Sequence, residues 1–487
     1  MQQLTGMDAS WLFLETPSTP MHIGVVNVFE RPDDSSFSPF DAARAQFASR
    51  VPSIAPLRRR LVDVPLQLGR PYWVMDPDFD IDAHLHHHID AVTTDDALAE
   101  LVGQIMSQPL DRRRPMWEAH IVDDIGDGRW ALITKYHHAT IDGGAGILLV
   151  HLLFDADPAA RPSVPATLVP DAEPLPTDAA VLARATASLV TSPRKLAKLQ
   201  LKLTRHATSQ VRTTGIAPLT ELAKQSLESL RSGPTRGGDL PPRTRLAPST
   251  PWNRALDGER TIAFKSLPIA DLVALKTALG GTINDVVMTM CAGGLRRYLV
   301  EHDALPDDPL IALVPMSLRT GAEADPWKNM ISMLMPSVAT NEADPMLRFE
   351  EMRRSMSTAK AQLGLTPDDL LDDVASLAPA SMMSAAVHLA SRLRLAERVG
   401  SPANLTISNV AGPRSPLYIS GSRLLNLTPV SLLIDGAGLN ITVLSCGDAF
   451  DIGLTSCPQA VPDLQFLLDC MLAELDHLFD ISGTARS

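Results

Sequence analysis

Two adjacent histidines, His137 and His138, stand shortly before an Asp-Gly pair at Asp142 and Gly143. A neutral imidazole, with an ordinary pKa of about 6.5, is suited to remove the proton of an alcohol that attacks a thioester. Such a base typically raises a rate by about 10²- to 10⁴-fold. The sequence contains no Gly-x-Ser-x-Gly nucleophile motif, which favours direct acyl transfer over a covalent acyl-enzyme. The segment therefore points to acyl-transfer chemistry.

Strand geometry separates the two histidines. Residues 131–138 read as a strand, in which alternate side chains face opposite sides. His138 would share one side with Tyr136, and His137 would share the other with Lys135. One imidazole can then act as a base while the other has a structural role, and the spacing alone does not say which.

The residues that follow the histidines suit a turn into a helix. Asp142 could cap that helix, or it could accept a hydrogen bond that fixes a nearby imidazole or arginine. Gly143 and Gly144 would let the backbone turn sharply and approach a ligand closely.

Strand-like and helix-like segments on both sides of a central region predict an α/β protein. The first half has a strand at residues 22–29 and a helix at 95–106. In the second half, residues 271–279 read as a helix, 310–315 as a buried strand, and 439–446 with 450–456 as a hairpin. Thr282 and Asp285 have the spacing of a capping box that opens a helix through residue 298.

Composition divides the chain into three parts. Residues 1–158 form an N-terminal half with the histidine pair, 159–250 a linker, and 251–487 a C-terminal half. Within the linker, residues 179–213 contain several Lys and Arg but no Asp or Glu. On a helical wheel, the cations of residues 194–205 lie opposite leucines. This is either a solvated bridging helix or a helix that contacts a membrane or lipid-droplet surface.

Overall composition argues against several classes of protein. The net charge of −13 disfavours nucleic-acid binding. There is no secretory signal, and no apolar stretch reaches the roughly 18 residues that a transmembrane helix needs. We expect a cytoplasmic protein, with peripheral attachment to the inner membrane or to lipid inclusions as a second option. The four cysteines are expected to be reduced core residues.

A histidine-rich run at residues 84–88 offers an alternative site. His84, His86 and His88 could share one face of a strand. No adjacent cysteine or carboxylate-spaced motif supports zinc. We therefore expect no metal site, and no bound cofactor.

An ordered set of segments resembles the bacterial wax ester synthase/diacylglycerol acyltransferase family. The matching segments lie at residues 4–17, 20–24, 109–118, 135–144, 282–287, 314–319, 408–413 and 439–443. The His-His-x-x-x-Asp-Gly pattern alone is shared with carnitine, chloramphenicol and peptide-synthetase-type acyl transferases, whereas the ordered set is far more specific. Met116 and Ala411 replace the Leu and Pro that are usual in the family, and Lys328 replaces a frequent Gly. These departures bear on the shape of the acceptor site more than on the reaction.

The resemblance implies an α/β fold of two chloramphenicol-acetyltransferase-like domains, with mixed sheets and the active site at their interface. It also implies acyl-CoA as the donor and co-substrate, and diacylglycerol or a long-chain alcohol as the acceptor. By match to the family motif, His138 would be the general base, His137 its orienting neighbour, and Asp142 a structural organiser of the site.

The resemblance implies further site residues in the second half. Asn284 would be a polar stabiliser in a first helical turn, where the dipole and the amide donors can steady an anion. Its alternative is a plain first-turn residue. The remaining candidates for substrate binding are Gly143, Trp117, Asp285, Ser408 and Asn409.

Three functions remain open at this point. The first is a CoA-dependent O-acyltransferase that makes triacylglycerol or wax ester. The second is a non-catalytic lipid-binding or droplet-coating protein, suggested by the basic residues at 194–205. The third keeps the fold and acylates a different hydroxyl or an amine.

Overall fold

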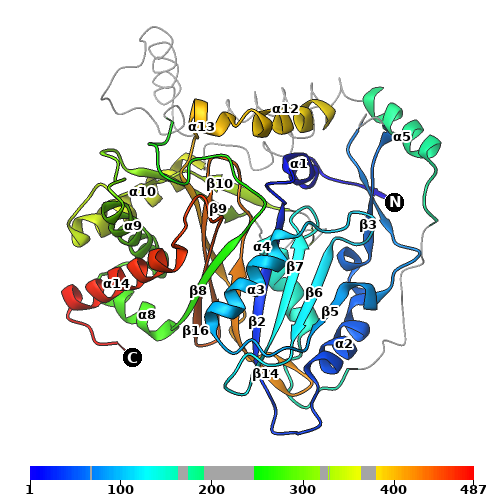
Figure 1. The fold of residues 1–487 in the computed structure, drawn as a ribbon, viewed down its shortest axis with the longest axis horizontal. Coiled ribbons are helices and arrows are strands. Elements are labelled where there is room, and N and C mark those ends of the chain that lie inside the picture. The colour runs from blue at the N-terminus through cyan, green and yellow to red at the C-terminus, as the bar shows by residue number, and fades with distance from the viewer. Residues whose placement is uncertain are drawn as a thin grey trace, which may run out of the picture.

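Two large mixed sheets lie side by side, and helices pack against both of them (Figure 1). The computed structural model describes residues 1–65, 69–162, 174–190, 246–318, 327, 329–363 and 380–486. The predicted α/β class is confirmed by this arrangement of mixed sheets and helices.

The first sheet has six strands, in the order β13-β14-β2-β7-β6-β5. Helices α2 and α4 pack on one face and α3 on the other, so the central strands are apolar along most of their length. The bounds are β2 His22–Glu30, β5 Leu85–His88, β6 Trp117–Val122, β7 Arg129–His137, β13 Tyr418–Ile419, β14 Ser422–Val430, α2 Pro39–Arg50, α3 Asp95–Ser107 and α4 Gly143–Leu153.

The second sheet has the order β10-β9-β12-β15-β16-β8, with β11 paired to β9. Strand β12 runs parallel to β9 and β15, and the other pairings are antiparallel. Helices α8, α9, α10 and α14 pack on it and form the largest apolar core. The bounds are β8 Thr261–Pro268, β9 Leu310–Ser317, β10 Ile331–Leu334, β11 Ser337–Val338, β12 Leu405–Ala411, β15 Leu439–Cys446, β16 Ala449–Ser456, α8 Ile269–Ala278, α9 Ile283–Glu301, α10 Pro345–Leu363 and α14 Leu464–Ser482.

The N-terminal segment of the chain lies against a late one. Helix α1 (Gly6–Leu14) contacts α12 (Ala380–Arg392), which runs above it in Figure 1. A small sheet in the order β1-β4-β3 pairs the first residues with a hairpin-like pair of strands. The bounds of these and the remaining elements are β1 Gln2–Gln3, β3 Arg59–Val62, β4 Tyr72–Met75, α5 Asp178–Val190, α13 Leu395–Val399, and the 3₁₀ turns η1 Val51–Ser53, η2 Ala55–Leu57 and η4 Ile81–His84.

The two large sheets are joined where β14 crosses β16. Although β14 comes from the C-terminal half, it pairs antiparallel with β2 of the first sheet. The buried carboxylate of Asp451 on β16 accepts hydrogen bonds from the Leu427 amide at 2.8 Å and from Asn426 Nδ2 at 3.1 Å. A Cβ at Gly453 would lie 1.9 Å from the Pro429 carbonyl oxygen, so only glycine permits this approach. This crossing fixes how the two halves face each other.

Most of the helices and strands predicted from the sequence are present, and their ends lie within a few residues of the predicted bounds. The helix expected at 95–106 is α3, and the hairpin expected at 439–456 is β15 and β16. The capping box is confirmed, because Thr282 accepts a bond from the Asp285 amide and Asp285 accepts one from the Thr282 amide. One boundary was wrong: β7 ends at His137, so His138 lies in the following turn rather than in the strand.

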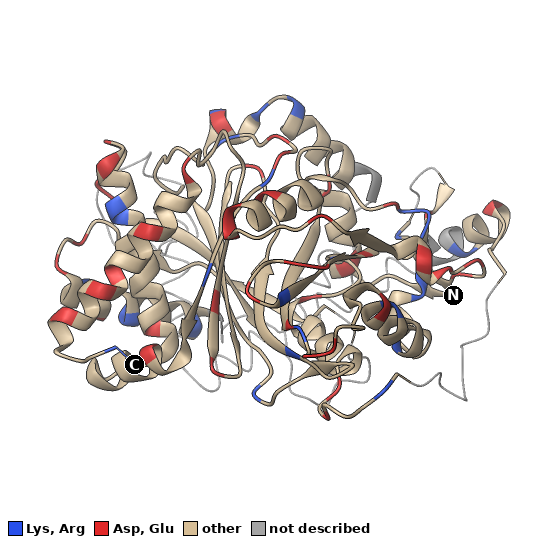
Figure 2. Cartoon of the chain, turned by 60° about the horizontal axis from the view of Figure 1, so that its bottom comes forward, with Lys and Arg blue, Asp and Glu red and all other residues tan. Residues whose placement is uncertain are grey.

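Charged residues lie mainly on helices and connecting loops, and the strands carry few of them (Figure 2). Within the described part of the chain, no helix has both the length and the apolar composition needed to cross a bilayer. The four cysteines are free and buried, as expected. The basic segment at 194–205 lies outside the described residues.

Gly453→Ala tests the crossing of the sheets. The added methyl group would meet the Pro429 carbonyl oxygen, so strand β14 or β16 would have to shift. We expect a loss of about 3 kcal/mol in unfolding free energy, as in severe overpacking. Chemical denaturation followed by circular dichroism measures this loss. Gly146→Ala is the control, because its Cβ would meet only an ordinary contact at 3.9 Å. An equal stability of both variants would contradict the proposed crossing constraint.

Candidate active site

The backbone of His138 is held from both halves of the chain. Its amide donates to the Met21 carbonyl at 2.8 Å, next to the start of β2. Its carbonyl accepts a hydrogen bond from Nδ2 of Asn329, which belongs to the C-terminal half, at 3.1 Å. The turn that carries the histidine is therefore positioned by the first sheet and by the segment before β10.

His137 is locked into the protein interior. Its side chain is 1% exposed, and its Nδ1 accepts a hydrogen bond from the Ala139 amide at 3.0 Å. Nε2 then carries the proton and lies 3.5 Å from Oε2 of Glu15. Glu15 also forms an ion pair with Arg112. This histidine braces the turn and has no opening toward a substrate.

Glu15 keeps its charge despite burial. Burial by itself raises the pKa of the Glu15 carboxyl, but hydrogen bonding and charge attraction from His137, and then from Arg112, lower that pKa to about 2. The result is an Arg112–Glu15–His137 chain that runs from a partly exposed arginine to the buried histidine at the turn.

His138 has a different environment. Its ring stacks on Trp11, with 4.1 Å between ring centroids and 31° between planes, and the residue is half-buried. Burial lowers the pKa of His138 to about 4, although the Asp142 charge and the Asn329 side chain raise it in part. The imidazole is therefore neutral near pH 7 and is able to accept a proton.

The two ring nitrogens of His138 are not equivalent. Nδ1 is enclosed and has no partner within hydrogen-bond geometry, and the same holds for Oδ1 of Asn329. The Asn329 side chain lies close enough to the ring to raise the pKa of His138. The tautomer with hydrogen on Nδ1 would leave the Nε2 lone pair free. Of the two ring nitrogens of His138, only Nδ1 is both enclosed and without a hydrogen-bond partner.

Asp142 connects the turn to a helix and to the other half. Its carboxylate is 1% exposed; Oδ1 accepts the Ala145 amide at 2.7 Å, and Oδ2 accepts the Met330 amide at 3.0 Å. The predicted helix cap is thus present. Neither Gly143 nor its neighbour Gly144 has a positive φ, so the expected sharp glycine turn was wrong. The cap residue makes the turn, and Gly143 begins α4 at an exposed position.

Asn329 is the residue that sequence reasoning missed. It is 3% exposed, and its Nδ2 donates to Oδ1 of Asp8 at 2.6 Å as well as to the His138 carbonyl. It therefore joins α1, the histidine turn and the C-terminal half. Its only signal in the sequence was its place just before the strand at Ile331–Leu334, within a segment that departs from the family pattern. Trp11 and Glu15 lay in a matching segment but had no predicted role.

The candidate residues of the second half fall into two groups. Asn284 and Asn409 meet, with Nδ2 of Asn409 donating to Oδ1 of Asn284 at 3.3 Å. Val410 lies 3.9 Å from the place of a Cβ at Gly143, but by strand alternation it faces the other side of β12 from Asn409, so this contact does not bring the asparagine pair to the start of α4. Asp285 is 8% exposed and is engaged in the helix cap. Ser408 is half-buried and, by strand alternation, faces away from Asn409.

Trp117 lies on β6 opposite Tyr136, close to the histidine turn, but its side chain is enclosed. Its side chain is 1% exposed, and its Nε1 donates to the Leu57 carbonyl at 2.8 Å. Its ring stacks on His84 with 4.4 Å between centroids. Trp117 is a core residue in this structure, with no face left for a substrate.

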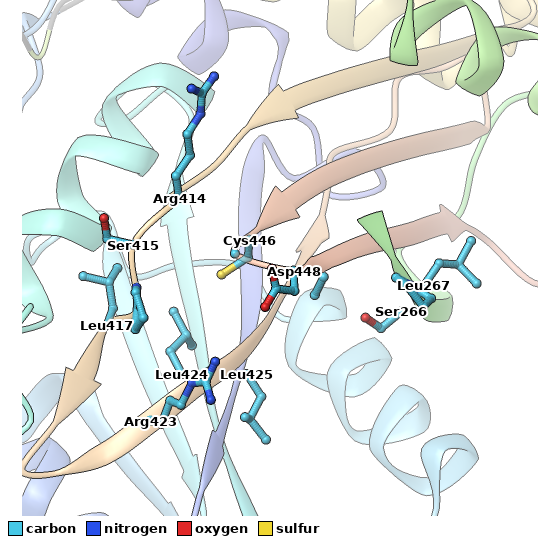
Figure 3. Close-up of a pocket in the computed structure, with 14 residues that line it drawn as sticks. Ser266, Leu267, Arg414, Ser415, Leu417, Arg423, Leu424, Leu425, Cys446 and Asp448 are labelled. Atoms are coloured by element: carbon cyan, nitrogen blue, oxygen red, sulfur yellow. The ribbon is translucent and has the colours of Figure 1, made fainter. Parts of the chain in front are cut away.

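A pocket of about 600 Å³ lies between the end of β8, the loop of residues 414–417, strand β14 and the β15–β16 turn (Figure 3). Its lining combines leucines such as Leu424 and Leu425 with Arg423 and Asp448, and none of the predicted site residues is among them. A second cavity, of about 20 Å³, adjoins Ala139 and Thr140 and has room for roughly one water.

Comparison with protein families matches both halves of the chain. Residues 4–287 match the wax ester synthase/diacylglycerol acyltransferase catalytic domain, and residues 327–479 match the WS/DGAT C-terminal domain. A Mycobacterium tuberculosis protein named as a diacylglycerol O-acyltransferase is 33% identical, over 99% of this chain and 91% of its own. A similarly named Mycobacterium bovis protein is 35% identical, over 98% of this chain and 91% of its own.

Solved structures are also similar to this chain over nearly its whole length. The wax ester synthase/diacylglycerol acyltransferase from Marinobacter aquaeolei VT8 is 27% identical, with a TM-score of 0.66 over 99% of this chain and 100% of that chain. The first condensation domain of the calcium-dependent antibiotic synthetase is 18% identical, with a TM-score of 0.56 over 100% of this chain and 97% of its own. The second likeness concerns the fold alone.

Glu15→Gln tests the bracing of the histidine turn. The substitution keeps the shape of the side chain but removes the charge that faces His137 and Arg112. Because a displacement of about 1 Å can cost up to roughly 10²-fold in rate, we expect acyl transfer to fall about tenfold or more. Initial rates of CoA thiol release measure it. Glu30→Gln, at the exposed far end of β2, is the control and should keep full activity. Full activity in Glu15→Gln would remove the bracing role.

Proposed function

The chain belongs to the wax ester synthase/diacylglycerol acyltransferase family and is an O-acyltransferase, and from this premise we propose that His138 is its general base. The donor would be a long-chain acyl-CoA, and the acceptor the hydroxyl of a diacylglycerol or of a long-chain alcohol. The observation that carries the proposal is a neutral, half-buried imidazole whose backbone is held from both halves.

The proposed reaction is a single direct transfer. Nε2 of His138 takes the acceptor's hydroxyl proton while the oxygen attacks the thioester carbonyl carbon. The tetrahedral intermediate then collapses, the carbon–sulfur bond breaks, and the imidazolium returns the proton to the CoA sulfur. The products are the ester and the free thiol, and the imidazole is neutral again. No covalent acyl-enzyme forms, in keeping with the lack of a nucleophile motif in the sequence.

The other predicted residues support this reaction in distinct ways. We assign His137 and Asp142 to positioning, because both are engaged in fixed hydrogen bonds around the turn. Asn284 and Asn409 are assigned to stabilise the oxyanion of the tetrahedral intermediate, aided by the amide donors at the start of α9. Asn329 is assigned to orient the His138 ring.

His138→Ala tests the base. We expect kcat/KM to fall by about 10²-fold or more, since a general base is worth this much. The assay supplies a long-chain acyl-CoA with diacylglycerol and hexadecanol together, follows thiol release, and separates the esters by thin-layer chromatography. His151→Ala, at an exposed position of α4, is the matched control. Undiminished turnover by a folded His138→Ala variant would exclude the imidazole as base.

The pH dependence tests the environment of the base. Because burial lowers the pKa of His138 to about 4, the ring stays unprotonated as the pH falls from 7 toward 5. The acidic limb of kcat/KM should therefore lie near pH 4 rather than near the ordinary value of about 6.5. Trp11→Ala would admit water to the ring and should move this limb upward. A wild-type limb near 6.5 would contradict the buried base.

We also propose that residues 194–205 bind the surface of a membrane or lipid inclusion, where both lipid substrates reside. The proposal rests on the basic amphipathic pattern of this segment. Replacing Lys195, Lys198 and Lys202 with Gln should weaken binding to anionic liposomes at least tenfold, because each cation near such a surface contributes about 1 kcal/mol. Co-sedimentation at low and high salt measures the binding.

The control for the liposome experiment removes the same charge elsewhere. Lys265, Lys276 and Lys360 lie on β8, α8 and α10, outside the basic segment. Their triple Gln variant should bind as the wild type does. Equal loss in both triple variants would show a dependence on net charge and would remove the special role of 194–205.

A further inference from the structure

A cluster of two imidazoles and one carboxylate lies at the edge of the first sheet, apart from the histidine turn. His86 on the edge strand β5 is in parallel register with His120 on β6. Glu118 precedes His120 by two residues and therefore faces the same side of the sheet. The sequence showed only the alternating histidines at 84–88, because the residues that face His86 come from another strand, β6.

The three side chains can reach one metal ion once the exposed His86 ring turns, because in the structure it stacks on His120 with 4.5 Å between ring centroids. One ligand atom from each of His86, Glu118 and His120 can be chosen so that all lie within 4.8 Å of one another. Nε2 of His120 is 3.6 Å from Oε2 of Glu118. Two ligands of a tetrahedral zinc ion, each about 2.1 Å from it, are about 3.4 Å apart. The pair thus needs almost no movement to share an ion.

His120 has a buried nitrogen without a partner. The residue is 9% exposed, and its Nε2 is enclosed with no hydrogen bond to the described protein. Its other nitrogen, Nδ1, lies 3.1 Å from Nε2 of His88. If the Nδ1 hydrogen is donated to His88, the Nε2 lone pair faces Glu118 directly. A cation between them would satisfy both groups, and an outer hydrogen bond of this kind is typical of metal-binding histidines.

We propose that His86, Glu118 and His120 form a binding site for a divalent transition-metal ion of the zinc class. Two imidazoles and one carboxylate prefer such ions to magnesium or calcium, which take mainly oxygen ligands. Lys135 also contacts Oε2 of Glu118 at 3.2 Å, so this oxygen, which has two lone pairs, would be shared between the ammonium group and the ion. Because His86 is exposed, water completes the coordination.

The role assigned to this site is structural. An ion held by His86 and by two residues of β6 would tie the edge strand to its only neighbour in the sheet order. It would bind the folded sheet and not the unfolded chain, so it would raise stability in proportion to the logarithm of its concentration. The site takes no part in the proposed acyl transfer, and its test does not depend on that activity.

The test titrates the untagged, full-length protein with Zn²⁺ by isothermal titration calorimetry. We expect one ion per chain, and a rise of the thermal midpoint with added Zn²⁺. His86→Ala removes an exposed ligand with little effect on folding and should weaken binding at least tenfold. Glu118→Gln should do the same.

His87→Ala is the matched control. His87 is adjacent to His86, but it pairs with Asp123 at 2.7 Å and stacks on Phe40, away from the cluster. This variant should bind Zn²⁺ as the wild type does. Equal weakening by His86→Ala and His87→Ala would reveal loose binding to a histidine-rich run, and would overturn the proposal. So would an absence of stoichiometric binding to the wild type.

Discussion

The site depends on hydrogen bonds that cross from one half of the chain to the other. Asn329 and the backbone of Met330 bind the carbonyl of His138 and the carboxylate of Asp142, and all of these groups are buried or partly buried. Each such bond contributes only about 1 kcal/mol, but leaving a buried partner unsatisfied costs about 1–3 kcal/mol. The same hydrogen bonds therefore dock the two halves and place the His138 imidazole.

The cross-half bonds are possible because the two sheets are already joined elsewhere. Strands β13 and β14 add to the first sheet, while β12 and β15, which come before and after them in the chain, lie in the second. The Asp451 carboxylate accepts a hydrogen bond from the buried Leu427 amide of β14, and Gly453 allows the two strands to approach closely. A rigid junction at the crossing keeps the segment before β10 in register with the turn of His138, which loose domains could not do.

Burial acts in opposite directions on the charged and the neutral groups of the site. It favours the neutral ring of His138, whose pKa falls to about 4. Glu15 resists the same effect, because His137 supplies a hydrogen-bond donor and Arg112 a positive charge, and the pKa of Glu15 falls to about 2. Two identical residues that are adjacent in the chain thus have different surroundings. His137 braces the turn through the partly buried carboxylate of Glu15, whereas His138 packs against Trp11 and keeps one ring nitrogen available for proton transfer.

Local patterns in the sequence correctly predicted the family, the acyltransferase activity and the α/β class. They also predicted most helices and strands, because periodicity, caps and motifs are short-range properties. They placed His138 in a strand, but the β2–β7 ladder ends at the pair of His22 and His137, and the chain turns at His138, whose amide donates to Met21 just outside the ladder. Trp117, Asn329 and the meeting of His86 with Glu118 and His120 were decided by contacts between distant segments. Such contacts depend on how sheets pair and pack, which no local pattern encodes.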